Sequence, residues 1–72
     1  MNIAFTSEIQ KIVRNGVDGL PEKLKLPLLL YYMEGMKERE IAEILSIPLG
    51  TVKSRISQAK EKLSELLTDK LR

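Results

Sequence analysis

The apolar residues near the C-terminus recur at a spacing that places them on one side of an α-helix. Five of them follow at intervals of 4, 3, 4 and 3 residues: Val52, Ile56, Ala59, Leu63 and Leu66. Residues spaced in this way share one face of a helix. No segment of the 72 residues shows the strict alternation that is typical of a half-buried strand. The sequence therefore predicts an all-α domain whose last helix begins at about residue 49 and runs toward residue 67 or beyond.

Two earlier helices are predicted from their start and stop signals. Thr6 or Ser7 can cap a first helix, and the pair Asn15-Gly16 is a typical helix end. Pro21 suits the first position of a second helix because its missing N–H would have no partner there.

The second helix contains a proline and a continuous apolar run. Pro27 removes a backbone hydrogen bond and clashes with the preceding turn, so we expect a kink or a break there, which gives four or five helices in all. The run from Leu28 to Met33 is apolar nearly all round, which is typical of a mostly buried helix. Gly35 is predicted to end it.

A short helix, a tight link and the long last helix follow. The short helix is predicted from about Glu38 to Leu45, and the link is Ser46-Ile47-Pro48. Four of its apolar side chains are expected to turn inward: Ile41, Ala42, Ile44 and Leu45. This order is the layout of a helix-turn-helix, here at about residues 38–60.

Composition limits the chemistry that the chain can perform. It has no cysteine and no histidine, which excludes disulfides, thiolate metal sites, cysteine nucleophiles and the usual general base. The longest apolar run is far shorter than the ~20 residues that span a bilayer, and the N-terminus lacks the layout of a signal peptide. We therefore expect a cytoplasmic, non-enzymatic module with no cofactor, no metal and no membrane partner.

The charge pattern is more informative than the net charge of +2. Between Thr51 and Lys60 there are three basic residues and no acidic one, whereas four glutamates lie between Glu34 and Glu43. One basic strip on a small domain offers a localised footprint for phosphate. A solvated helix face explains the same strip equally well on charge alone.

The apolar face of the last helix determines which way its basic residues point. At about 100° per residue, inward Val52 and Ile56 leave four polar side chains pointing outward from the first turns: Lys53, Ser54, Ser57 and Gln58. A recognition helix presents this part to base edges in the major groove, where lysine can reach guanine and glutamine can pair with adenine. Arg55 and Lys60 fall on the two flanks of the stripe, which favours phosphate contacts.

The stretch from Leu20 to Leu63 resembles region four of bacterial extracytoplasmic-function sigma factors, the C-terminal domain that binds the −35 promoter element. Four motifs carry the resemblance: Leu20-Pro21-Glu22-Lys23, Leu30-Tyr31-Tyr32-Met33-Glu34-Gly35, Glu40-Ile41-Ala42-Glu43-Ile44-Leu45 and Gly50-Thr51-Val52-Lys53-Ser54-Arg55. The resemblance implies a winged-helix-like domain of the sigma region four type, without strands. We expect one domain over residues 1–72, with a linker and first helix in 1–19 and region four in 20–67.

The resemblance also implies roles and partners. The last helix would read double-stranded promoter DNA, and the earlier helices would dock on the flap of the RNA polymerase β subunit. An anti-sigma factor often masks one or both surfaces, and the domain usually acts as a monomer. Carried over by position, Lys53 and Ser54 would face the groove, Thr51 and Arg55 would contact phosphate or the groove edge, and Lys60 matches a position that is often basic.

Three positions depart from the family pattern. Lys37 stands where a serine or threonine cap is usual, which predicts either a weak helix start or a phosphate contact. Ser46 replaces a common turn glycine, so a serine must adopt a backbone conformation that is less favourable for it than for glycine. Gln58 stands where arginine is frequent, which removes a charge and shifts the expected base preference toward adenine.

Other interpretations stay open at this stage. The chain could be a protein-interaction module that keeps the fold, such as an anti-sigma decoy or a polymerase-binding adaptor. It could also be the related output domain of response regulators, although Ser54-Arg55 fits that class less well. The −10-binding domain of the family cannot fit within 72 residues, so the chain is expected to be either an excised fragment or a stand-alone protein.

Overall fold

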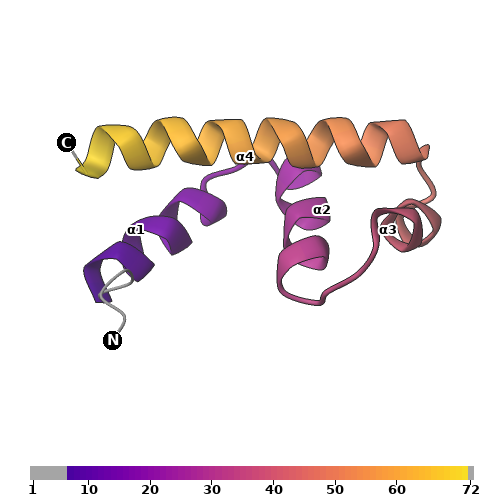
Figure 1. Ribbon diagram of the computed structural model, residues 1–72, viewed down its shortest axis with the longest axis horizontal. Helices are drawn as coiled ribbons and strands as arrows, with labels where there is room; N and C mark the ends of the chain where they lie inside the picture. Colours follow the sequence, from indigo (N-terminus) through magenta and orange to yellow (C-terminus); the bar gives the residue numbers. More distant parts are fainter. Residues whose placement is uncertain (1–6, 72) are drawn as a thin grey trace.

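The computed structural model describes residues 7–71, and every regular element in this range is a helix. The four helices are α1 (Ser7–Asp18), α2 (Glu22–Tyr32), α3 (Glu38–Leu45) and α4 (Leu49–Leu71). Figure 1 shows α4 running along the whole molecule, with the other three helices arranged in order on one side of it. The predicted all-α fold class with a helix-turn-helix is confirmed.

The core lies where α2 and α3 meet the first half of α4. It consists of eight buried apolar side chains: Leu20, Leu24, Leu28, Ile41, Ala42, Val52, Ile56 and Ala59. Three of the predicted stripe residues are the α4 contribution to this core. The helix packs against α1, α2 and α3 in turn, so a single amphipathic helix holds the domain together.

Helix α1 does not end at Asn15-Gly16 as predicted; it continues to Asp18. Gly16 is buried against α4, where a Cβ atom would lie 2.6 Å from Leu66 Cδ2. Glycine inside a helix costs about 1 kcal/mol in propensity, and the close approach of the two helices offsets that cost. Thr6 and the Ser7 side chain, the two predicted caps, lie outside the described residues.

Of the predicted kink or break at Pro27, the break is wrong, because α2 is continuous from Glu22 to Tyr32. Residues 7–71 therefore contain four helices. Pro27 is less than 2% exposed. Its ring therefore gains packing that compensates for the one hydrogen bond that the proline removes. The missing donor is the N–H of position 27, which in a regular helix would bond the carbonyl of Lys23 one turn earlier.

Both ends of α2 differ by a few residues from the prediction. Pro21 precedes the helix as its N-cap, and its carbonyl accepts hydrogen bonds from the N–H groups of Leu24 and Lys25, both at 2.9 Å. The helix was predicted to continue up to Gly35, but its last residue is Tyr32. Gly35 instead makes the turn with a φ of +67°, a conformation that glycine adopts without strain.

Helix α3 has the predicted bounds, but one of its four expected core residues is wrong. Ile41, Ala42 and Leu45 face the core, whereas Ile44 is 63% exposed. At about 100° per residue the first three lie within one arc, and Ile44 falls outside it on the side away from Ala42. Ile41 and Ile44 are three positions apart, and this spacing alone did not show that only Ile41 faces the core.

The link between α3 and α4 carries the strain that the missing glycine predicts. Ser46 is left-handed, with φ 57° and ψ 44°, and its N–H donates to carbonyls of α3. Ile47 packs partly buried against the core, and the Pro48 carbonyl accepts from Thr51 and Val52 at the start of α4. Backbone hydrogen bonds therefore join the link to α3 at its first residue and to α4 at its last. Among residues 7–71, no helix combines the length and the hydropathy that a membrane-spanning segment requires.

Candidate nucleic-acid interface

The outward face of α4 carries the four side chains predicted to meet base edges. Lys53, Ser54, Ser57 and Gln58 are all exposed, as predicted. On the opposite face of the same turns, Val52 is 0% and Ile56 3% exposed. The buried face fixes the rotation of the helix about its own axis, and the outward face therefore has one defined orientation.

Two of these side chains are already connected to each other. Gln58 Nε2 donates a hydrogen bond to Ser54 Oγ at 3.1 Å, one helical turn earlier. A glutamine amide has two N–H hydrogens and one acceptor oxygen. One N–H and the oxygen therefore remain for a second partner, and these are the two groups that pair with adenine N7 and N6.

Lys53 lies on the outward face but has a partner that the sequence did not reveal. Its Nζ lies 3.0 Å from Oε1 of Glu38, the first residue of α3. The two residues are 15 positions apart, so the ion pair bridges the two helices of the helix-turn-helix. Local spacing rules apply to neighbours on one helix and could not have found it.

The predicted phosphate contacts Thr51 and Arg55 are half-buried in the first turns of α4, and Lys37 is exposed. Lys37 stands at the N-cap of α3 with an extended backbone and offers no side-chain cap. Its backbone N–H donates instead to Glu40 Oε1 at 2.8 Å. This bond supplies half of a capping box, so the predicted weak start of α3 is offset by a neighbouring glutamate.

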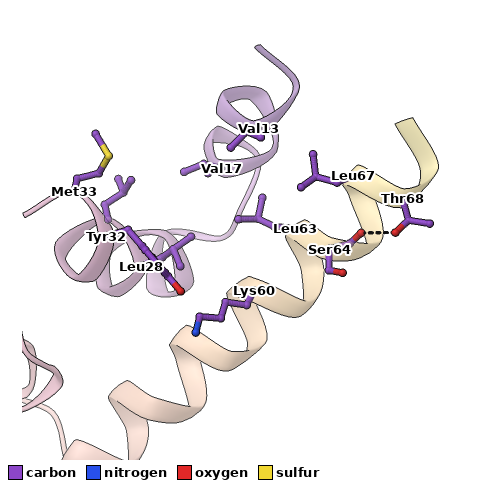
Figure 2. Close-up of a pocket in the computed structure, with 11 residues that line it drawn as sticks. Val13, Val17, Leu28, Tyr32, Met33, Lys60, Leu63, Ser64, Leu67 and Thr68 are labelled. Atoms are coloured by element: carbon purple, nitrogen blue, oxygen red, sulfur yellow. Dashed lines mark hydrogen bonds between the residues drawn. The ribbon is translucent and has the colours of Figure 1, made fainter. Parts of the chain in front are cut away.

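The ammonium of Lys60 lies toward α2, away from the predicted outward residues. It is 5.5 Å from the ring centre of Tyr32 and 5.9 Å from that of Tyr31, a cation–π arrangement. Figure 2 shows the side chain extending from α4 toward Tyr32. Hydrogen bonding with Tyr32 raises the pKa of Lys60 above its ordinary value of 10.5, and the Glu38 carboxylate adds a smaller contribution of the same sign.

Lys60 also lines an apolar groove that the sequence did not predict. The groove has a volume of about 600 Å³ and is formed by α1, α2 and α4 (Figure 2), with the lining side chains Val13, Val17, Leu28, Leu29, Tyr32, Met33, Lys60, Leu63, Ser64, Leu67 and Thr68. Met33 is 74% exposed at its rim. The continuous apolar run of α2 was the available signal, because it exceeds the single face that one core can bury.

The described residues contain no cluster of three or more aspartate, glutamate, cysteine or histidine side chains that could hold a metal. All buried side chains in the described range are apolar. The polar chemistry of the described molecule is therefore on its surface. Six of the eight predicted contact residues gather on the first half of α4; Lys37 stands at the start of α3, and Lys60 turns to the groove.

Comparison with known proteins identifies the family. The family described as "Sigma-70, region 4" matches residues 10–63. The chain is 43% identical over 60 residues to the ECF RNA polymerase sigma-E factor of Haemophilus influenzae, which covers 83% of this chain and 32% of that protein. It is 38% identical to the sigma-E factors of Salmonella typhimurium and Escherichia coli, over 83% of this chain and 31% of each.

The chain thus spans about a third of the length of these curated relatives. The match begins at residue 10 and so includes most of α1, which extends the predicted resemblance toward the N-terminus. The resemblance to region four is confirmed by both comparisons. The chain belongs to the sigma-70 region 4 family, in its extracytoplasmic-function branch.

Proposed function

We propose that this chain binds the −35 element of double-stranded promoter DNA and thereby acts in transcription initiation. The observation that carries the proposal is the exposed polar face of α4, formed by Lys53, Ser54, Ser57 and Gln58. A helix of this kind enters the major groove with its N-terminal residues at the base edges. The family membership of the chain supports the same function.

The residues divide into two kinds of contact. The four outward side chains would read base edges, with Gln58 positioned for adenine by its bond to Ser54. Lys37, Thr51 and Arg55 would hold phosphates on either side of the groove, which sets the register without reading sequence. With few cationic contacts, the isolated chain should bind weakly and with strong dependence on salt.

Lys60 has a different place in this proposal. Its predicted phosphate contact requires the ammonium to leave the Tyr31 and Tyr32 rings. We therefore assign Lys60 to the rim of the groove, with at most a secondary contact to DNA. A Lys60→Ala variant should lose less affinity for duplex than a Lys53→Ala variant in the same titration.

The groove would be the second binding surface of the chain. An amphipathic helix inserts its apolar side chains into a groove of this kind, and we propose that its occupant is a helix of the RNA polymerase β flap. The exposed Met33 and Tyr32 at the rim and the apolar floor support docking there. An anti-sigma factor would act by covering this groove, the α4 face or both. The function needs no catalytic group, and the chain would act as a monomer.

A titration of labelled duplex with the 72-residue chain at low salt tests the DNA proposal. A site selected from a random library, a scrambled duplex and a Lys53→Ala/Arg55→Ala variant are compared. We expect clear preference for the selected site and loss of binding by the variant. Equal binding of both duplexes by a folded chain would favour the alternative function, a protein-interaction module that keeps the fold. The Lys53–Glu38 pair supports that alternative, because it partly neutralises the basic strip.

A further inference from the structure

The ion pair between Glu38 and Lys53 joins two helices of the described residues, α3 and α4. The other ion pair in this range, Lys25 with Glu22, lies within α2 at a longer 3.8 Å. Glu38 reaches Lys53 from the first turn of α3, next to the predicted phosphate contact Lys37. Its side chain is 29% exposed, against 59% for Lys53. The carboxylate therefore lies at the edge of the proposed DNA-binding surface, on the protein side of the ammonium.

A negative charge at the edge of a DNA-binding surface has a cost. It repels every phosphate of any sequence, and it neutralises a lysine that would otherwise attract one. Its effect on a guanine base edge is different. A lysine ammonium has three N–H donors, so one can stay with Glu38 while the other two reach the O6 and N7 acceptors of guanine.

We propose that Glu38 is a specificity-determining residue of the DNA-binding surface, which withholds the Lys53 ammonium from phosphates and directs it to the guanine of a G·C pair. The inference rests on the proposed function of α4. Glu38 thus lowers affinity for DNA in general and raises the discrimination between sequences.

A matched pair of variants tests this directly. Glu38→Gln and Glu43→Gln each remove one negative charge from α3, but among the described contacts only Glu38 is an ion-pair partner of Lys53. The readouts are affinities of the 72-residue chain for a selected duplex and a scrambled duplex across a salt series. A panel in which each base pair of the selected duplex is replaced measures discrimination position by position.

For Glu38→Gln we expect on the order of 3- to 10-fold tighter binding to the scrambled duplex near 0.1 M salt, with a salt slope steeper by about 0.9, the value of one added phosphate contact. The ratio of selected to scrambled affinity should fall, and the loss should concentrate at one G·C position. Glu43→Gln should leave the slope and that position unchanged. Glu38→Asp keeps the charge but shortens the side chain by one methylene, and its discrimination should fall at the same position.

A Lys53→Met background isolates the pair. There Glu38→Gln should no longer change the salt slope, because the ammonium that it releases is absent. Identical behaviour of Glu38→Gln and Glu43→Gln, with wild-type discrimination intact, would overturn the role of Glu38 alone. A wild-type chain that selects no preferred duplex would contradict the proposed function and this inference with it.

Discussion

The two halves of α4 carry the same apolar spacing but differ in what covers it. In the first half, Val52, Ile56 and Ala59 are almost completely buried under α2 and α3. In the second half, Leu63, Leu66 and Leu67 are only half-buried, beside α1 and an open groove of about 600 Å³. A helical stripe therefore shows which side of a helix is apolar, and the neighbouring elements decide whether that side becomes core or binding surface.

This difference suits the two proposed tasks of the domain. Base readout needs side chains on a rigid support, and the closely packed first half of α4 provides it. Docking of a partner needs apolar surface that the free chain does not cover, and the second half provides that. The predictions below compare the two halves, from the largest expected effect to the smallest.

The largest effect should come from truncating the stripe in its first half. Ile56→Ala creates a cavity in the core and should lower the free energy of unfolding by about 2–5 kcal/mol. Leu67→Ala, which trims a side chain at the groove, should cost less than Ile56→Ala because the site is already open and no enclosed cavity forms. Urea denaturation measures both. Equal losses would show that the second half is packed as closely as the first.

Gly16→Ala should destabilise the junction of α1 and α4 by about 1 kcal/mol. The new methyl group would overlap Leu66 and press on Leu63 Cδ2 at 3.0 Å, and overpacking of 1–3 kcal/mol outweighs the gain in helix propensity. In a Leu66→Ala background the penalty should shrink, since the nearest atom is gone. A penalty that stays the same in both backgrounds would contradict the close approach as its cause.

Ser46→Gly should stabilise the helix-turn-helix by about 0.5–1 kcal/mol. Glycine removes the steric cost of the left-handed backbone at this position. Ser57→Gly, in the interior of α4, should destabilise by a similar amount because glycine is a poor helix former. Thermal unfolding should thus move in opposite directions for the two variants, and a shift of the same sign in both would refute the strain at Ser46.

The smallest effect concerns Lys60 at the edge of the groove. Its pKa is raised above 10.5 in the folded chain, chiefly by hydrogen bonding with Tyr32. A raised pKa means that the contact stabilises the fold fully below pH 10.5 and that this contribution disappears as pH rises through the folded pKa. Tyr32→Phe should bring the pKa back toward 10.5 in an NMR titration of the lysine side chain. An unchanged pKa in that variant would rule out the hydroxyl as the cause.

Local signals in the sequence predicted the helix-turn-helix well. The bounds of α3, the link at Ser46 and the outward face of α4 follow from turn and periodicity rules that act within a few residues. The helix-stop reading of Gly16 and the expected break at Pro27 were wrong because tertiary burial compensated for a poor local preference at both positions.

The features that the sequence did not reveal depend on contacts between distant residues. The Glu38–Lys53 pair spans 15 positions, and the groove is assembled from three helices. Lys60 was correctly placed on a flank of α4, but its direction depends on two tyrosines of α2. Spacing rules show which residues of one helix share a face. They do not show which side chain of another helix contacts that face.

One measurement tests most directly the claim that the first half of α4 binds DNA and the groove does not. The same labelled, selected duplex is titrated at low salt with wild type, with Lys53→Ala/Arg55→Ala and with the groove variant Tyr32→Ser/Met33→Ser. We expect the first variant to lose about 10-fold or more in affinity, since two cationic side chains are removed, and the groove variant to stay within about twofold of wild type. Equal losses in the two variants, or wild-type binding by both, would contradict the division of α4 into a DNA-binding half and a docking half.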